Sequence, residues 1–340
     1  MGNVPMVSVL MPVYNGEQWL DAAIKSILMQ SYSDFELLIL LEYGSSEKSR
    51  GMVYGYTDRR IRVIENKERL GLAASLNIGI KEARGKYIAR MDADDISKQK
   101  RLEKQVSYLE KHPDIAICGT FMWKYRIIVH SLPVSSMQIR FFSFYGCAFA
   151  HPTVMWRREL FLRKNLFYHE GIETEDFEFW TRVLDQCKGA NIPEPLLSYR
   201  VSPQSKSVKS KEIMEQENDI ILEPYWTRHG MRYFAPDGYC QCLGIGNEAV
   251  RQQEWRLLEL VHKTRAFKGK GRIVRKIFFD IYMPETMQVG VLVKHYGRLF
   301  PDLYKNSVLA GFQTFVYAVY RVIKKLAQQM LVSARGGDGI

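Results

Sequence analysis

Apolar and polar positions follow two different spacings over the first hundred residues of the chain. Short, nearly continuous apolar runs are typical of strands buried on both faces, and between them apolar positions recur every three or four residues, as in amphipathic helices. The expected strands are Val7–Met11, Phe35–Leu41, Arg60–Ile64 and Lys86–Met91. The expected helices are Gly16–Met29, Ser45–Tyr56 and Leu72–Ala83. Repeated units of this kind predict an α/β fold, a Rossmann-like, mostly parallel sheet flanked by helices.

The pattern is less regular after residue 96. The further expected helices are Ser97–Lys111, Ser136–Phe142, Thr174–Leu184 and Lys211–Arg228, and the further extended segments are Ile115–Gly119, Phe121–Val129, Thr153–Trp156 and Pro193–Val201. The polar stretch Ser202–Ser207 predicts a boundary. We therefore expect a catalytic domain over residues 1–205, a mainly helical, basic extension over residues 206–332, and a disordered tail over residues 333–340.

Composition places the chain among globular proteins. Its 340 residues are 46% hydrophobic and 25% charged, which is enough apolar content for a full core. The five cysteines are scattered, odd in number and without CxxC spacing, and this predicts reduced thiols and a cytoplasmic location. No apolar run reaches the length of a membrane span, and no basic segment precedes the first apolar run as in a signal peptide.

The net charge of +11 is concentrated near the C-terminus. Residues 261–340 contain 14 Lys or Arg and 4 Asp or Glu, a net charge of +10. Within this region the apolar stretch Val308–Tyr320 is followed by Arg321, Lys324 and Lys325. Such a basic, aromatic-rich helix suits peripheral attachment to an anionic membrane surface at the inner face of the cell membrane, and it equally fits a core helix with a solvated face.

Three carboxylates follow the fourth expected strand, in Asp92-Ala93-Asp94-Asp95. Open α/β sheets bind ligands at the carboxyl ends of their strands, and carboxylates crowded there repel one another unless a cation neutralises them. Mg²⁺ and Mn²⁺ prefer such oxygen ligands and commonly bind substrate phosphates as well. The motif predicts a metal site, with an acidic first turn of the following helix as the alternative.

Three further places offer candidate chemistry. In Pro12–Asn15, at the end of the first strand, the ring of Tyr14 could stack on a planar base, or the segment is simply a strand-to-helix turn. Asp176 could act as a general base. Alternatively, it is one of several acidic residues that stabilise the N-terminus of the expected helix. His151 could bind or hydrogen-bond a metal or phosphate group, although a lone histidine is more often structural.

Taken in order, these residues resemble family 2 of the glycosyltransferases, the inverting group with the GT-A fold, in its bacterial polysaccharide and lipopolysaccharide branch. The matching stretches are Ser8–Asn15, Phe35–Ile39, Ala83–Asp95, Arg101–Gln105, His151–Met155, Glu175–Asp176 and Leu196–Arg200. As a set they are specific, and they cover roughly residues 5–205.

The resemblance implies a nucleotide-diphosphate sugar donor, most often a UDP-sugar, bound across the ends of the first four strands. Asp94 would coordinate Mg²⁺ or Mn²⁺ on the diphosphate. Asp92 would support the ribose or the metal shell, and Pro12 and Tyr14 would contact the nucleotide.

The resemblance also assigns the proton transfer. Asp176 would take the proton from a hydroxyl group of a saccharide or lipid-linked acceptor as this oxygen attacks the anomeric carbon. Glu175 and His151 would support the site.

One stretch departs from the family pattern. The family usually has two aspartates before Gly-Ser after the second strand, whereas this chain has Leu41-Glu42-Tyr43-Gly44-Ser45. Glu42 keeps a supporting carboxylate, but Tyr43 replaces the acid that reads the base. The identity of the nucleotide is therefore left open.

Two other classes of function compete with this prediction. A nucleotidyltransferase would want a Gly-rich loop with a basic residue after the first strand, which Pro12–Gly16 does not supply. A nucleotide- or polyanion-binding protein of the same fold without transferase activity would account for the basic C-terminal region. Nucleic acid is not expected as a partner, because the basic residues are interleaved with apolar helix rather than with stacking aromatic side chains.

Overall fold

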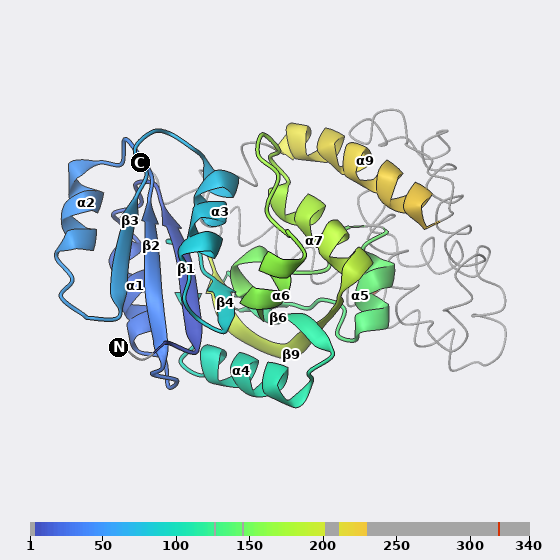
Figure 1. The fold of residues 1–340 in the computed structure, drawn as a ribbon, viewed down its shortest axis with the longest axis horizontal. Coiled ribbons are helices and arrows are strands. Elements are labelled where there is room, and N and C mark those ends of the chain that lie inside the picture. The colour runs from blue at the N-terminus through green and yellow to red at the C-terminus, as the bar shows by residue number, and fades with distance from the viewer. Residues whose placement is uncertain (1–3, 126, 145, 201–210, 230–318, 320–340) are drawn as a thin grey trace. The chain divides into compact units, whose positions relative to one another are not determined.

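The computed structural model describes residues 4–125, 127–144, 146–200, 211–229 and 319 (Figure 1). The chain divides into two compact units, Met1–Ile221 and Leu222–Ile340. The expected boundary Ser202–Ser207, the apolar stretch Val308–Tyr320 apart from Val319, and the tail 333–340 lie outside the described residues. Among the helices that the structure describes, none is both long enough and apolar enough to cross a bilayer.

The first half of the sheet is parallel, as the sequence predicts. Its strands are β1 (Val7–Val13), β2 (Phe35–Leu41), β3 (Ile61–Glu65) and β4 (Tyr87–Arg90), in the spatial order β3-β2-β1-β4. The helices that connect them are α1 (Leu20–Leu28), α2 (Glu47–Tyr54) and α3 (Leu72–Glu82). Figure 1 shows these units in blue and cyan.

Helices cover both faces of this parallel half. Alternate side chains of β1, beginning with Val7 and Val9, share a buried cluster with Ala23 and Ile24 of α1. The opposite face of β1 and β2 contacts α3, where a Cβ on Gly79 would lie 2.8 Å from Leu40 Cδ1. Because strands alternate their side chains between faces, a sheet covered on both sides needs the continuous apolar runs seen in the sequence.

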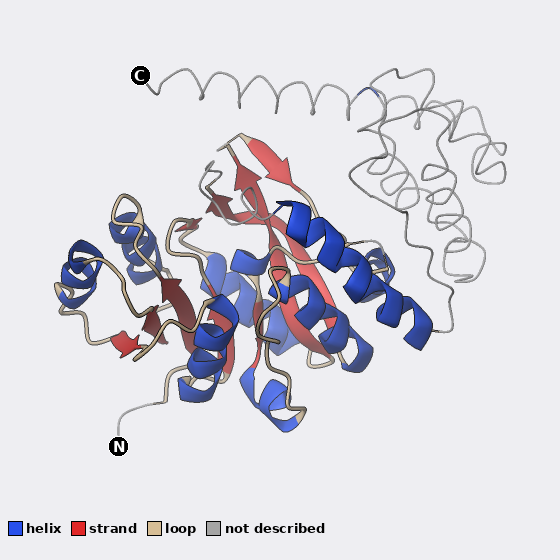
Figure 2. Ribbon diagram, turned by 90° about the horizontal axis from the view of Figure 1, so that it is seen from above, coloured by secondary structure: helices blue, strands red, loops and turns tan. Residues whose placement is uncertain are grey.

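The second half of the sheet is mixed. Its strands are β5 (Ile96–Ser97), β6 (Ile115–Lys124), β7 (Ile128–His130), β8 (Met155–Arg157) and β9 (Lys188–Tyr199). The short strand β8 pairs antiparallel with both β4 and β6 and so joins the two halves, while β6 and β9 are parallel. In the described part of the chain these strands form one sheet in the order β3-β2-β1-β4-β8-β6-β9-β5, with β7 paired to β6 (Figure 2).

Five helices and a 3₁₀ turn accompany this second half in the described residues. They are α4 (Arg101–Lys111), α5 (Ser136–Phe142), α6 (Arg158–Arg163), α7 (Glu175–Gln186) and α9 (Lys211–Arg228), with a short 3₁₀ helix η1 (His151–Thr153) before β8. Helices α5, α7 and α9 confirm the expected helical segments closely. For α7 the reason is its amphipathic spacing, which is local information.

The expected helix start at Ser97 is wrong. Ile96 and Ser97 form β5, paired with β9, and α4 begins at Arg101. The Ser97 N–H donates to Ser26 Oγ (3.1 Å), and the Lys98 N–H donates to the Leu196 carbonyl (2.9 Å). These partners are distant in the chain, so the helical spacing that starts near Ser97 gives no sign of them.

The expected break near residue 120 is also wrong. Strand β6 continues from Ile115 to Lys124, and the chain turns only at Tyr125, whose φ of 53° lies in the left-handed region. Pairing with β9 over nearly its whole length holds β6 together across irregularities in register.

Candidate active site

The carboxyl ends of β1, β2 and β4 bring three predicted site segments to one edge of the sheet. Val13 lies opposite Leu41 in the β1–β2 register, and Leu10 lies opposite Arg90 in the β1–β4 register. The residues that follow these strands therefore emerge side by side. They comprise the Tyr14 turn, the Glu42 turn and the acidic loop that begins at Asp92.

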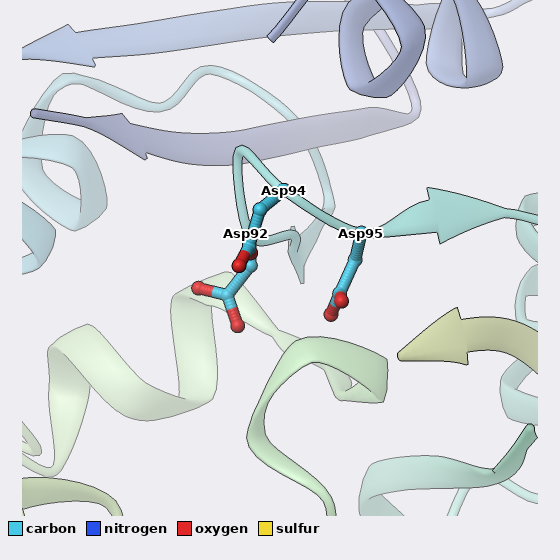
Figure 3. A group of neighbouring side chains, drawn as sticks. All are labelled: Asp92, Asp94 and Asp95. Atoms are coloured by element: carbon cyan, nitrogen blue, oxygen red, sulfur yellow. The ribbon is translucent and has the colours of Figure 1, made fainter. Parts of the chain in front are cut away.

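The acidic loop gathers three carboxylates. One oxygen from each of Asp92, Asp94 and Asp95 lies within 4.8 Å of the others, and all three side chains point to the same side of the loop (Figure 3). Burial, together with the negative charge of Asp92, raises the pKa of Asp94 to about 6. Burial and the charges of Asp92 and Asp94 raise the pKa of Asp95 well above its usual range. The cluster therefore carries an electrostatic cost that a bound cation would remove.

Arginine side chains hold this loop from three directions. Arg90, the last residue of β4, is buried and forms an ion pair with Asp92. The buried Arg101 of α4 donates from Nη2 to the Arg90 carbonyl (2.6 Å), and burial lowers its pKa to about 10, so it stays charged near neutral pH. After β9, Arg200 donates from its backbone N–H to Asp95 Oδ1 (2.8 Å) and from Nε to the Asp94 carbonyl (2.9 Å).

Asp95 offers a direct indication that the residues fit a metal ion. Its side chain is fully buried, and its Oδ2 atom accepts no hydrogen bond within the described part of the chain. A buried carboxylate oxygen without a donor is costly, and a divalent cation shared with Asp94 would satisfy it. The sequence singled out Asp94, and the structure adds Asp95 as a candidate ligand.

Two exposed aromatic rings lie at the neighbouring strand ends. Tyr14 is 48% exposed and Tyr43 is 55% exposed, so both rings have free surface on which a planar base could stack. The guanidinium carbon of Arg69 lies 5.1 Å from the centre of the Tyr14 ring. Pro12 is the penultimate residue of β1, and Asn15 turns the chain with a φ of 60° while its Oδ1 accepts the Ser46 N–H (2.9 Å).

The carboxylate of Glu42 is enclosed by protein donors. Its Oε1 accepts the N–H groups of Tyr43 (3.0 Å) and Leu70 (3.1 Å), and its Oε2 accepts the Gly71 N–H (2.8 Å). The Ser75 hydroxyl also donates to Oε2 (3.2 Å). Burial tends to raise the pKa of Glu42, but these donors outweigh it and lower the pKa below its usual value. Glu42 therefore ties β2 to the start of α3.

Glu42→Gln is expected to destabilise the fold by about 1–3 kcal/mol. The amide N–H₂ group is a donor, so it would face backbone N–H groups and leave them without an acceptor. The pKa of Glu42 is lowered by folding, so its contribution is present at neutral pH and is lost as the pH falls through that lowered value. Denaturant unfolding at pH 7 measures the effect, with Glu47→Gln, an exposed position in the first turn of α2, as a control. Equal stability of Glu42→Gln and the wild type would contradict this role.

The candidate base, Asp176, stands in the first turn of α7. It is half-buried, and its Oδ1 accepts the Phe177 N–H (2.8 Å). The Cys147 thiol lies 3.9 Å from Asp176 Oδ2, and burial together with the Asp176 charge raises the pKa of this thiol well above its usual value. The thiol thus stays protonated and can donate a weak hydrogen bond to the carboxylate.

His151 and Tyr168 connect α7 to the acidic loop. His151 Nε2 lies 2.9 Å from the Tyr168 hydroxyl, and His151 Nδ1 lies 3.9 Å from Glu175 Oε1. The buried Tyr168 is held by Asn77 of α3, which accepts the Tyr168 N–H (2.8 Å) and donates to its carbonyl (2.9 Å).

Tyr168 lies within electrostatic reach of both acidic groups. Burial raises the pKa of its hydroxyl well above the usual value, and the charges of Arg90, Asp176, Glu175 and Asp92 all act on it. The sequence predicted a carboxylate after β4 and another at the start of α7, and charges from both places act on this one phenol.

The chain is similar to known glycosyltransferases. The model of the family described as glycosyl transferase family 2 matches residues 8–169. An uncharacterized glycosyltransferase of Haemophilus influenzae is 30% identical over 328 residues, which cover 89% of this chain and 94% of that protein. The O-antigen biosynthesis glycosyltransferase WbnJ of Escherichia coli is 34% identical over 212 residues, covering 59% of this chain and 81% of WbnJ. The chain belongs to glycosyl transferase family 2 and is a glycosyltransferase.

Solved structures share its fold. TarS of S. aureus, in complex with UDP-GlcNAc, has a TM-score of 0.57 at 14% identity, over 95% of this chain and 91% of the other. The mannosyltransferase PcManGT of Pyrobaculum calidifontis, in complex with GDP-Man and Mn²⁺, has a TM-score of 0.51 at 15% identity, over 96% and 88%. At this identity the likeness concerns the fold, and it confirms the GT-A architecture.

Several residues around the site were not assigned a role from the sequence. Tyr168 and Cys147 gave no motif of their own, since their partners Asn77 and Asp176 are distant in the chain. Arg90 lies within the matching stretch Ala83–Asp95 but was given no role there. Arg200 belongs to the stretch Leu196–Arg200 that contributed to the family resemblance, and this was the available signal. Glu175 is the first residue of α7, and His151 lies next to it.

Proposed function

We propose that the protein transfers a sugar from a nucleotide-diphosphate sugar, in the first place a UDP-sugar, to a hydroxyl group of a saccharide or lipid-linked acceptor, with inversion at the anomeric carbon. The observation that carries the proposal is the cluster of Asp92, Asp94 and Asp95 at the sheet edge, whose oxygens lie within 4.8 Å of one another and in which Asp95 is fully buried. The UDP-GlcNAc complex of TarS and the GDP-Man complex of PcManGT support a donor of this class.

Asp94 and Asp95 would hold a Mg²⁺ or Mn²⁺ ion, with Asp92, already paired to Arg90, at the edge of its coordination shell. When bound, such an ion supplies positive charge that stabilises the departing nucleoside diphosphate. The buried, unsatisfied Asp95 Oδ2 and the Mn²⁺ in the PcManGT complex support this assignment.

The reaction itself would rely on the chain's own groups. The rings of Tyr14 and Tyr43 would stack on or flank the base, and Pro12 would shape the floor beneath the nucleotide. Asp176 would accept the proton of the acceptor hydroxyl as its oxygen bonds to the anomeric carbon and the bond from that carbon to the diphosphate oxygen breaks. His151, through Tyr168 and Glu175, would keep the start of α7 in place.

The acceptor and the cellular setting are proposed on a coarser basis. The O-antigen role of WbnJ supports polysaccharide biosynthesis. Scattered cysteines favour the cytoplasm, and the +10 charge of residues 261–340 favours peripheral attachment to an anionic membrane surface. Family membership favours this enzyme over a polyanion-binding protein without catalysis.

A thermal-shift screen of nucleotide sugars with and without Mn²⁺ tests the donor. A donor at 100 times its dissociation constant should raise the melting temperature by about 5 °C, and EDTA should abolish the effect. UDP-GlcNAc, UDP-galactose, GDP-mannose and free UDP form the panel, and NMR of the anomeric proton in the product checks inversion. If heparin stabilised the protein and no nucleotide sugar did so with either Mg²⁺ or Mn²⁺, the non-catalytic alternative would be favoured.

A further inference from the structure

The start of the base helix α7 is held by a side chain from much later in the chain. Glu217 of α9 accepts the Glu173 N–H at Oε1 (2.9 Å) and the Thr174 N–H at Oε2 (2.8 Å). The Thr174 hydroxyl donates to the same Oε2 atom (2.8 Å). Both carboxylate oxygens are thus engaged by the two residues that directly precede Glu175 and Asp176.

This contact replaces an ordinary helix cap. Thr174 is the N-cap residue of α7, where a threonine side chain usually accepts an N–H group of the first turn. Here the Thr174 side chain accepts no N–H group of the first turn, and its hydroxyl donates to Glu217. The start of α7 is therefore anchored by a side chain of α9 and not by the side chain of its own N-cap residue.

Stabilisation of α7 alone does not explain why a negatively charged side chain, that of Glu217, is found at this position. The first turn of α7 already contains three acids, Glu175, Asp176 and Glu178. A fourth carboxylate is repelled by these acids, and this repulsion offsets the favourable interaction of a carboxylate with a helix N-terminus. What the carboxylate adds is two oxygens in a fixed plane, which orient two successive peptide groups at once.

We infer that Glu217 is a positioning residue for the catalytic base, so that the N-terminal half of α9 is part of the catalytic apparatus. By fixing the peptide groups of residues 173 and 174, it sets the direction in which α7 presents the Asp176 carboxylate. This inference rests on the proposed role of Asp176. It assigns a function to a residue beyond 8–169, the part of the chain that the family model matches.

The test compares Glu217→Ala, Glu217→Gln and Glu223→Gln in the full-length protein, with release of UDP from UDP-GlcNAc in the presence of Mn²⁺ as the assay. Glu223 is an exposed carboxylate on the same helix and serves as the matched control. We expect Glu217→Ala to lower kcat by about 10- to 100-fold with KM for the donor unchanged within about twofold, since a base displaced by about 1 Å loses reactivity without losing the donor site. Glu217→Gln, which keeps one acceptor oxygen, should fall between Ala and the wild type, and Glu223→Gln should match the wild type.

Hydrogen exchange of the peptide 170–178 supplies a readout that does not depend on turnover. Loss of the Glu217 acceptor should speed exchange at residues 173 and 174 by about tenfold, without a change in peptides of the parallel sheet half. Should Glu217→Ala fail to fold, Glu217→Gln carries the comparison.

Different outcomes separate this inference from the proposed function. If Asp176→Asn abolishes UDP release while Glu217→Ala retains full kcat, the positioning role is wrong and the base assignment stands. The positioning role would also be wrong if Glu217→Ala raised KM for the donor while it lowered kcat. It would likewise be wrong if hydrogen exchange at residues 173 and 174 were unchanged in this variant. If Asp176→Asn leaves the rate intact, the proposed base is wrong and the role of Glu217 falls with it.

Discussion

Replacing Asp176 with Asn is expected to lower kcat for sugar transfer by about 100- to 10,000-fold, the usual range for loss of a general base. The amide has nearly the same shape as the carboxylate but cannot take up the proton of the attacking hydroxyl. Binding of the donor should be unaffected, because no donor contact is assigned to this side chain. Steady-state kinetics with UDP-GlcNAc and Mn²⁺, together with the melting temperature shift caused by UDP and Mn²⁺, separate the two effects.

Asp185→Asn provides a control for the same chemical change on the same helix. Asp185 is exposed near the other end of α7, and its replacement should leave kcat within about twofold of the wild type, as surface substitutions usually do. An Asp176→Asn variant with wild-type kcat would refute the base assignment. A variant that lost donor binding and turnover together would instead indicate a structural role for Asp176.

Replacing Asp94 with Ala should weaken Mn²⁺ binding and lower kcat/KM by about 100-fold or more, which corresponds to about 3 kcal/mol of lost charge stabilisation. The reason lies in the cluster itself, where the partly buried Asp94 lies beside the fully buried Asp95 and both have raised pKa values. The same substitution should raise the melting temperature of the metal-free protein or leave it unchanged, because it removes one of three repelling carboxylates. Isothermal titration with Mn²⁺ and calorimetric unfolding in EDTA measure both.

Asp114→Asn is the matched control for this experiment. Asp114 is exposed and pairs with the exposed Lys188, an ion pair of small energetic value. Unchanged Mn²⁺ affinity in Asp94→Ala would remove Asp94 from the metal site. Weakened Mn²⁺ affinity in Asp95→Asn, with Asp94→Ala unaffected, would move the site to Asp95.

The fold was largely predictable because its information is local. Most parallel strands are nearly continuous apolar runs, and each connecting helix carries its own spacing, so the units β1 to β4 were found within a few residues of their observed bounds. The errors fall where partners distant in the chain decide. Ile96 and Ser97 are extended because β9 supplies their hydrogen bonds, and β6 stays continuous because β9 is paired along it.

The candidate site was predictable to a lesser degree. Asp94 and Asp176 stand at the end of a strand and the start of a helix, positions that local sequence can locate. Its family position suggested that Glu42 supports the donor site. In the structure its carboxylate accepts hydrogen bonds from Gly71 and Ser75 and so connects β2 to α3. Tyr43 is exposed, so its ring is free for contact with a base, and the nucleotide preference remains a prediction for the donor screen.

By itself, the sequence determined the order of the first four strands and of the helices between them, the presence of three carboxylates at one strand end, and an acid in the first turn of α7. Hydrophobic spacing and short motifs encode these features within a few residues. Only the tertiary structure decided that Asp95 is buried with an unsatisfied oxygen, that Arg200 holds the acidic loop, and that Glu217 holds the base helix. The physical reason is that each of these depends on a hydrogen-bond donor or acceptor supplied by a segment far along the chain, and the pattern around either partner carries no trace of the other.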